Sequence, residues 1–142
     1  MALSRERNSG THVFFLEHVV KLADKKNKNE FAPAILMMPS SQAIIEEVSA
    51  NPSAVGYVGL GYLTKKEKAL AIAKNANPTI VGNSSYVLPS VATVTKGVYP
   101  ISRSLLFYTN GEPSEKIKPF IAFILSPEGQ KIVLKMDFVP IK

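Results

Sequence analysis

The sequence predicts an α/β domain, and three segments that follow an opening helix carry that prediction. A short apolar run at 34–39 predicts a buried strand, Ser40 or Ser41 can cap a second helix, and a β-branched and aromatic run at 54–63 predicts another buried strand. Strand, helix and strand in succession indicate an α/β sheet. The chain has 142 residues, of which 46% are hydrophobic, so it is long enough to bury the core of one ordinary domain.

The opening helix is expected to run from about Gly10 to about Ala23. Its apolar residues recur at helical spacing and are Leu16, Val19, Val20 and Ala23. The second helix has an apolar face made by Ala43, Ile44 and Val48, opposite Glu46 and Glu47, and it is expected to end at Asn51-Pro52-Ser53. Gly56, Gly59 and Gly61 have the wrong order and place for a dinucleotide-binding loop, so we interpret them as glycines that allow close packing.

The second half of the chain has a weak pattern up to Lys96 and a stronger one after it. The run at 69–73 predicts a short strand, followed by a loop rich in Asn, Pro and Ser, and 98–113 predicts a long extended segment that ends in an Asn-Gly turn. Two amphipathic helices should follow, one with Ile117, Phe120, Ile121 and Ile124 on its apolar face, the other with Ile132, Val133 and Met136. Pro119 fits the first turn of the earlier helix, and Ser126-Pro127 fits the start of the later one.

The residue content disfavours several kinds of chemistry. The chain has no cysteine, which excludes disulfides, thiolate catalysis and cysteine zinc sites. His12 and His18 are six residues apart and so lie on different faces of a helix; we expect both at surface or boundary positions, without a shared metal. Neither a hydrolase motif nor a Walker-type phosphate loop occurs. We therefore predict no catalysis, no metal and no cofactor.

The charge favours anionic partners without naming one. There are 17 basic and 11 acidic residues, a net charge of +6. The lysine-rich stretch at 24–30 has no interleaved aromatic residue, so we interpret it as a solvated connector rather than a nucleic-acid surface. Proline, asparagine and serine interrupt the charge-free interval between Lys74 and Lys96, so no membrane span is expected there. The first residues lack the apolar core of a secretory signal, which leaves a cytoplasmic protein or the mature or excised part of an exported one.

The stretch Ser4-Arg-Glu-Arg-Asn-Ser-Gly-Thr-His12 places two arginines directly before a helix start. A helix N-terminus offers unpaired backbone N–H groups, Gly10 allows close approach, and Ser9 and Thr11 add hydroxyl donors. Arg5 adds a full positive charge in a fork that can bind two oxygens of a tetrahedral anion. On these residues alone, an anion site and a plain helix cap with solvated arginines both remain open.

Four segments resemble, in the same order, the phosphate-specific substrate-binding proteins of ABC transporters. They are Arg5-Glu-Arg-Asn-Ser-Gly-Thr11, which matches the motif Arg-x-x-x-Ser-Gly-Thr, and the stretches at 51–62, 99–113 and 123–141. The resemblance runs over essentially the whole chain. It implies a three-layer, type II periplasmic-binding-protein-like fold, in which two α/β lobes close on one phosphate without covalent chemistry.

The resemblance also implies the site, the partners and the location. Arg5, Ser9, Gly10 and Thr11 occupy the positions that bind phosphate oxygens in that family. The implied ligand is inorganic phosphate, the implied partner is an ABC-transporter permease, and the implied location is the periplasm or another extracytoplasmic compartment. No nucleic-acid partner is expected.

Two departures from the family pattern shape our expectations. Full-length members have a further lobe at their beginning, so we expect this chain to be a single α/β domain without that N-terminal lobe. Residues 1–97 would form the core of the second lobe, and 98–142 the crossover strand and returning C-terminal helices. In addition, Arg7 stands where the family usually has an acidic residue, which strengthens anion attraction but loosens the steering of Arg5 unless Glu6 braces it. Asn8 replaces a common glycine and tolerates a tight turn.

The C-terminal helices raise the question of what covers their apolar faces. Without the N-terminal lobe they would expose roughly several hundred Å² of apolar surface, more than a monomer usually tolerates. We therefore expect self-association, or a partner chain that carries the missing lobe. The alternative function is a truncated relative that acts as an oligomerising interaction or structural module with a vestigial anion site.

Overall fold

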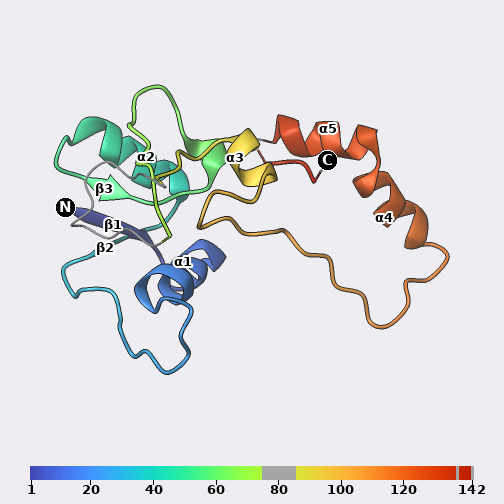
Figure 1. The fold of residues 1–142 in the computed structure, drawn as a ribbon, viewed down its shortest axis with the longest axis horizontal. Helices are drawn as coiled ribbons and strands as arrows, with labels where there is room; N and C mark the ends of the chain where they lie inside the picture. The colour runs from blue at the N-terminus through green and yellow to red at the C-terminus, as the bar shows by residue number, and fades with distance from the viewer. Residues whose placement is uncertain (75–85, 137, 142) are drawn as a thin grey trace. The chain divides into compact units, whose positions relative to one another are not determined.

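The structure is a computed structural model that describes residues 1–74, 86–136 and 138–141 (Figure 1). Most of the predicted loop rich in Asn, Pro and Ser lies outside these residues. The chain divides into two compact units, Met1–Ala69 and Leu70–Lys142. The predicted boundary at residue 97 between lobe core and returning segment stays a prediction.

The first unit is built on a parallel sheet of three short strands: β1 (Ala2–Arg5), β2 (Leu36–Met38) and β3 (Val55–Gly56), in the order β2-β1-β3. β1 is therefore the central strand. It pairs along its length with β2, so that Arg5 lies opposite Met38, and it pairs with β3 from Ala2 to Leu3. All strands point the same way, which brings their carboxyl ends to one edge of the sheet.

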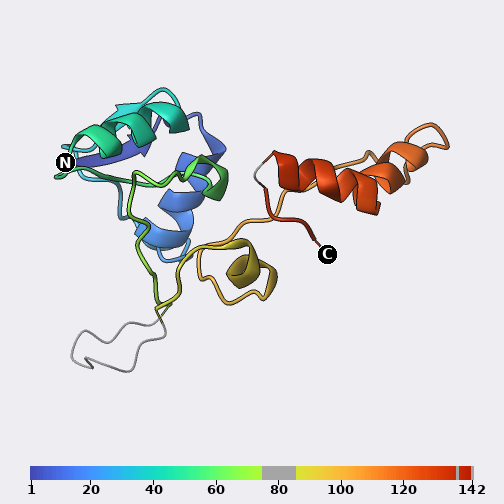
Figure 2. The same ribbon diagram turned by 90° about the horizontal axis from the view of Figure 1, so that it is seen from above.

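Two helical connections join these strands and cover the sheet. The α1 helix (Gly10–Phe15) continues as a π-helical turn, η1 (Leu16–Val20), and leads from β1 to β2, whereas α2 (Ser41–Ala50) leads from β2 to β3. Both views show α1 and α2 on opposite sides of the strands (Figures 1 and 2). This gives a helix–sheet–helix arrangement. The connection through α1 runs along the sheet in one direction and the connection through α2 runs in the other, and right-handed crossovers of opposite direction place their helices on opposite faces.

The core of the first unit lies between α2 and β1. Leu3, Ile44 and Ile45 are its buried apolar residues. Ser40 caps α2, its hydroxyl oxygen accepting from the Ala43 amide at 3.0 Å, which turns Ile44 and Ile45 toward the strands. The predicted second helix is thus confirmed, including its cap and its end at Asn51.

The predicted opening helix is confirmed, but it ends at Val20 rather than Ala23. Leu22 and Ala23 both have positive φ angles, 54° and 57°, which cannot continue a right-handed helix. The helix therefore stops about one turn early, and its last described turn is widened to the π form.

The predicted strands are present but differ in length and burial. β2 and β3 are much shorter than the runs at 34–39 and 54–63, and Leu36 and Val55 are about half exposed. The prediction that they are buried is wrong because both lie at the edges of the sheet. Residues 60–62 form a 3₁₀ turn, η2 (Leu60–Tyr62), instead of continuing β3. The buried strand is β1, which has only four residues and which the sequence pattern did not reveal.

The second unit contains three described helices: α3 (Val91–Thr95), α4 (Lys118–Leu125) and α5 (Pro127–Lys135). The start of α3 was not predicted; Ser90 and Thr93 cap each other there. Both C-terminal helices are confirmed, with Pro119 in the first turn of α4 and Ser126 capping α5. No helix in the described part of the chain is long and apolar enough to span a membrane.

Two predicted extended segments of the second unit do not form strands. The run at 69–73 is reduced to a single antiparallel bridge between Ile72 and Val87. Residues 98–113 bend near Asn110-Gly111, where Gly111 has a φ of +75°, but they pair with no other strand among the described residues. Within the part of the chain that the structure describes, these residues therefore do not form a strand, since a strand needs a neighbour to take up its backbone hydrogen bonds.

Candidate anion-binding site

The candidate site lies at the edge of the sheet where the strands end. Arg5 is the last residue of β1, and α1 and α2 begin just after β1 and β2. In the strand order β2-β1-β3, the chain passes from β1 to β2 on one side and then crosses to β3 on the other side of β1. The point between β1 and β3 is therefore a topological switch point. In open α/β sheets, ligands bind outside the carboxyl ends of the strands at such a point.

The guanidinium of Arg5 is held by the corner between β2 and α2. Its Nη1 donates to Ser41 Oγ at 3.1 Å and its Nη2 donates to the Pro39 carbonyl oxygen at 3.1 Å. Its Nε is buried and has no hydrogen-bond partner among the described residues. Glu6, which the sequence suggested as a brace, makes no ion pair with Arg5 in the described part of the chain.

The predicted helix start at Ser9-Gly10-Thr11 is present. Ser9 is the N-cap of α1, and its Oγ accepts from the Thr11 amide at 3.2 Å. The Ser9 amide donates to the Glu6 carbonyl at 2.9 Å, which closes the turn between β1 and α1. That short turn brings Arg5 and the Ser9-Gly10-Thr11 segment to the same edge of the sheet. The Arg5 side chain is bonded to the β2–α2 corner, whereas the Ser9 side chain is bonded within its own helix.

A buried polar cluster beneath Arg5 was missed in the sequence. His12 is only 4% exposed, so the prediction of a surface or boundary position is wrong for it, whereas His18 is exposed as predicted. The His12 Nδ1 lies 2.9 Å from the Arg5 carbonyl oxygen and 3.0 Å from Ser4 Oγ. A carbonyl oxygen can only accept a hydrogen bond, so His12 Nδ1 must be protonated and donate to the Arg5 carbonyl oxygen. His12 therefore fixes the backbone from which the Arg5 side chain projects.

Tyr57 extends this cluster from the end of β3. Its hydroxyl is 2.6 Å from Ser4 Oγ, and its ring stacks on Phe15 with centroids 3.8 Å apart. Burial raises the pKa of Tyr57, partly opposed by its hydrogen bond to Ser4 and by the nearby charge of Arg5. Tyr57 is the residue that links β3 to the centre of the site. Its sequence signal was only its place directly after Gly56, within the strand predicted at 54–63.

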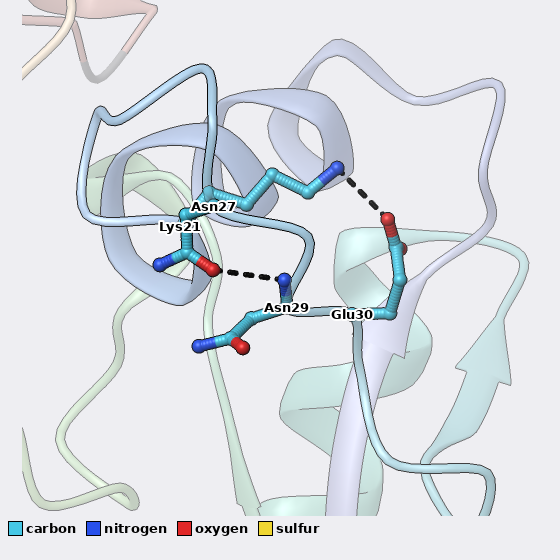
Figure 3. Close-up of polar contacts among 4 residues, drawn as sticks. All are labelled: Lys21, Asn27, Asn29 and Glu30. Atoms are coloured by element: carbon cyan, nitrogen blue, oxygen red, sulfur yellow. Dashed lines mark hydrogen bonds and ion pairs between the residues drawn. The ribbon is translucent and has the colours of Figure 1, made fainter.

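Arg7 and the lysine-rich connector lie beside this site rather than in it. Lys21, just before the connector, pairs with Glu30 at its far end at 2.8 Å, and the Asn27 side chain accepts from the Asn29 amide at 2.9 Å within it (Figure 3). The hydrogen bond from Lys21 lowers the pKa of Glu30, and the charge of Arg7 adds to this. A cavity of about 370 Å³ lies nearby, lined by Arg7, His12, Glu30, Phe31, Ala32, Pro33, Ile35 and Met37.

The arrangement places one guanidinium at the corner between β2 and α2, where its Nη1 donates to Ser41 at the first position of α2. A helix start has backbone N–H groups and a dipole that favour negative charge. No group of three or more His, Asp or Glu side chains in the described part of the chain could hold a metal ion.

Comparisons with known proteins place the chain in a family. A family model described as a PBP superfamily domain matches residues 2–128. The chain is 30% identical over 141 residues to the phosphate-binding protein PstS of Pseudomonas aeruginosa, and 34% identical over 143 residues to the phosphate-binding protein PstS 2 of Streptococcus pneumoniae. These matches take in 96% and 99% of this chain, but only 40% and 45% of the two relatives.

Solved structures agree with the sequence relatives. A phosphate-binding protein of a phosphate ABC transporter from Streptococcus pneumoniae matches with a TM-score of 0.75 and 30% identity, over 99% of this chain and 51% of that chain. PstS from Borrelia burgdorferi matches with a TM-score of 0.66 and 28% identity, over 99% of this chain and 53% of that chain. The chain thus spans less than half the length of the curated relatives named above and about half of these solved chains.

These matches confirm the expected resemblance to phosphate-specific substrate-binding proteins and the expected α/β fold class. The fit with the first solved structure extends over nearly the whole chain, so the small parallel sheet and its helices are part of a larger, shared fold. Since the family model covers residues 2–128, the chain belongs to the PBP superfamily, the periplasmic-binding-protein-like proteins.

Proposed function

We propose that this chain binds inorganic phosphate, as part of the substrate-binding component of a phosphate ABC transporter. Arg5, Ser9, Gly10 and Thr11 would hold the ligand. The observation that carries the proposal is the position of Arg5, at the carboxyl end of the central parallel strand and four residues before Ser9, the N-cap of α1. The relatives support it, because those compared above are named phosphate-binding proteins.

Each proposed ligand residue supplies a different part of the binding. Arg5 provides a full positive charge and two or more N–H donors in a plane that matches the oxygens of a tetrahedral anion. Gly10 and Thr11 supply backbone at the helix start, where the helix dipole attracts negative charge. The hydroxyls of Ser9 and Thr11 can donate to phosphate oxygens, since the Ser9 Oγ uses only its acceptor side in capping α1. These groups bind and orient an anion, and none of them acts as a nucleophile in the proposal.

The proposal includes a second lobe that faces this site. The chain matches half of the solved relatives, and a ligand held from one side only remains open to water. Water screens each charge contact, so binding by this chain alone should be weak compared with binding between two closed lobes. The second lobe would come from another polypeptide segment or from a second copy, and the transporter permease and an extracytoplasmic location follow from the same proposal.

The test is a phosphate titration of wild type, Arg5→Ala and Arg7→Ala, followed by calorimetry and by thermal unfolding. Arg7→Ala is the matched control, because it removes the same charge two residues away, from the lining of the neighbouring cavity. We expect phosphate to raise the unfolding temperature of wild type and of Arg7→Ala, but not of Arg5→Ala. A charged hydrogen bond contributes about 1.5–3 kcal/mol, so the loss of Arg5 should weaken binding by a factor of about ten or more.

The same experiment also separates the proposed function from the alternative of a purely structural module. If phosphate stabilises Arg5→Ala as much as wild type, the ligand is not bound by this site. If tens of millimolar phosphate changes neither the heat signal nor the unfolding temperature of wild type, phosphate binding by this chain is refuted.

A further inference from the structure

We propose that Ser41 is a positioning residue, which fixes the direction of the Arg5 guanidinium and so prepares it for the anion. The inference rests on the proposed function, because Arg5 is the residue that would touch the ligand. Ser41 lies in a different segment from the Ser-Gly-Thr motif, at the first position of α2. It would act only through Arg5.

The contact is built by the sheet itself. In the pairing of β1 with β2, Arg5 lies opposite Met38, and the Glu6 amide continues the ladder by donating to the Met38 carbonyl at 3.2 Å. The residues that follow β2 form the corner that leads into α2, and this places Pro39 and Ser41 beside the Arg5 side chain. Ser41 is 5% exposed, which marks it as a packed position rather than a surface one.

Two acceptors in this corner hold the two ends of the guanidinium. Ser41 Oγ accepts a hydrogen bond from Nη1, and the Pro39 carbonyl oxygen accepts one from Nη2, both at 3.1 Å. Two contacts on different nitrogens fix the plane of the group as well as its position. A guanidinium has five N–H donors, so after these two bonds one N–H remains on Nη1 and one on Nη2, besides the buried Nε–H. Of the two acceptors, only the Ser41 hydroxyl belongs to a side chain and can be removed by substitution.

The support is electrically neutral, which distinguishes it from a carboxylate brace. Within the described residues, the ion pairs join Lys21 to Glu30 and Lys118 to Glu115, and neither involves Arg5. A hydroxyl and a carbonyl orient the guanidinium without cancelling its charge, so the full charge remains directed at the ligand. Arg7, at the position where a carboxylate brace would be expected, lines the cavity next to Glu30 instead.

Holding Arg5 in place before the anion arrives should improve binding. A free arginine side chain loses rotamer freedom when a ligand immobilises it, at a cost of about 0.5–1.5 kcal/mol. Without the Ser41 hydroxyl, the Arg5 side chain would lose this rotamer freedom only when phosphate binds, so phosphate binding would become weaker. We therefore expect Ser41→Ala to weaken phosphate binding about three- to tenfold, less than the loss of Arg5 itself.

The experiment compares wild type, Ser41→Ala, Ser41→Thr and Gln42→Ala, each alone and in the Arg5→Ala background. Ser41→Thr restores the hydroxyl, and Gln42→Ala changes the next residue of α2, whose side chain bonds only to Glu46 among the described residues. Phosphate affinity is measured by titration. In parallel, the Arg5 side-chain Nε–H resonance is followed in ¹⁵N-labelled protein by its hydrogen exchange, which reports on the buried Nε without any ligand.

We expect Ser41→Ala to weaken phosphate binding and to speed exchange at the Arg5 Nε–H, while Ser41→Thr and Gln42→Ala resemble wild type. In the Arg5→Ala background, Ser41→Ala should change binding no further. Equal affinity and equal Nε–H exchange in wild type and Ser41→Ala would overturn the inference, as would a loss of affinity that persists without Arg5. If wild type itself does not bind phosphate, the proposed function fails, and the Nε–H exchange alone still decides whether Ser41 holds Arg5.

Discussion

Arg5 is held through both its backbone and its side chain, which bears on its proposed role in binding phosphate. Its carbonyl oxygen receives the His12 Nδ1–H at 2.9 Å and the Ser4 hydroxyl at 3.0 Å, so the end of β1 is fixed from below. The side chain then leaves the strand and is held by Ser41 and Pro39. A residue fixed at both ends loses little further freedom on binding, which is the property that a preorganised anion site needs.

Tyr57 gives the buried cluster a measurable pH dependence. Burial raises its pKa above the ordinary value of 10.0, so the folded protein holds the phenol proton more tightly than the unfolded chain does. The contribution of Tyr57 to the free energy of unfolding is therefore complete below that ordinary value. It decreases as the pH rises above it, because only the unfolded chain then gains from ionisation.

We expect Tyr57→Phe to reduce the late part of the tyrosinate absorbance change in an alkaline titration of the folded protein, leaving the contribution of Tyr99, whose pKa burial also raises. The same titration in denaturant is the control, because unfolding abolishes the burial that shifts this group. A difference between wild type and Tyr57→Phe that is already complete near the ordinary tyrosine pKa would contradict the buried position of the ring.

The sequence predicted the site residues that act locally and missed those that act across the fold. Ser9 was predicted as a helix start, because its hydroxyl bonds to an amide two residues away in the same segment. Ser41 was not predicted to contact Arg5, because that contact depends on strand pairing between segments that are more than thirty residues apart. His12 was not predicted to be buried, because its burial depends on which face of α1 lies against the sheet. Local patterns carry no direct signal for such contacts.

At the scale of elements, β3 and α2 approach each other closely at Gly56. A Cβ atom at this position would lie 2.5 Å from Ile44 Cγ2, well inside contact distance, and 3.5 Å from Leu3 Cβ. Ile44 and Leu3 are themselves buried, so they have little room to move aside. The expectation of a glycine that permits close packing therefore agrees with the geometry at this position.

We expect Gly56→Ala to destabilise the protein by about 1–3 kcal/mol, the usual cost of overpacking a core. Gly59→Ala is the matched control, since its Cβ would meet only Tyr62 Cδ2 at an ordinary 3.7 Å and its φ of −64° suits alanine. Chemical denaturation of both variants provides the measurement. Equal stability of the two variants would show that β3 and α2 are not packed together as described.

The strands were harder to predict than the helices for a physical reason. A helix satisfies its own backbone, so the caps at Ser40 and Ser126 and the periodic apolar residues were sufficient to place α2 and α5. A strand takes its hydrogen bonds from other segments, and β1 is buried only because β2 and β3 flank it. Its four residues, Ala-Leu-Ser-Arg, are too few to show a strand pattern by themselves.

At the scale of the whole molecule, the two units differ in how they bury apolar side chains. The buried apolar residues of the described chain, Leu3, Ile44 and Ile45, all belong to the first unit. The helices α4 and α5 contact each other, and Phe107 of the preceding segment meets Phe120 of α4 edge to face. Neither helix has a buried apolar side chain among its described residues. Their exposed apolar side chains include Ile117, Phe120, Phe123, Leu125, Ile132, Leu134 and Met136.

Such a surface should behave as an unfilled interface in solution. Contiguous apolar surface of several hundred Å² is rare on monomers and is usually covered by another protein surface. We expect the isolated chain to bind a hydrophobic dye and to sediment as more than a monomer. A Phe120→Ser, Ile132→Ser variant should lower both signals, because these side chains are 58% and 50% exposed and lie on α4 and α5.

The control for this prediction is Leu22→Ser, which removes a 73% exposed apolar side chain from the first unit. It should leave dye binding and sedimentation close to wild type, since an isolated apolar residue on the surface is ordinary. The double variant on α4 and α5 should in turn keep the phosphate response of wild type, because Arg5, Ser9, Gly10 and Thr11 all lie in the first unit. Monomeric wild type without dye binding would show that the helices cover their own apolar faces, and the expectation of a partner surface would then be wrong.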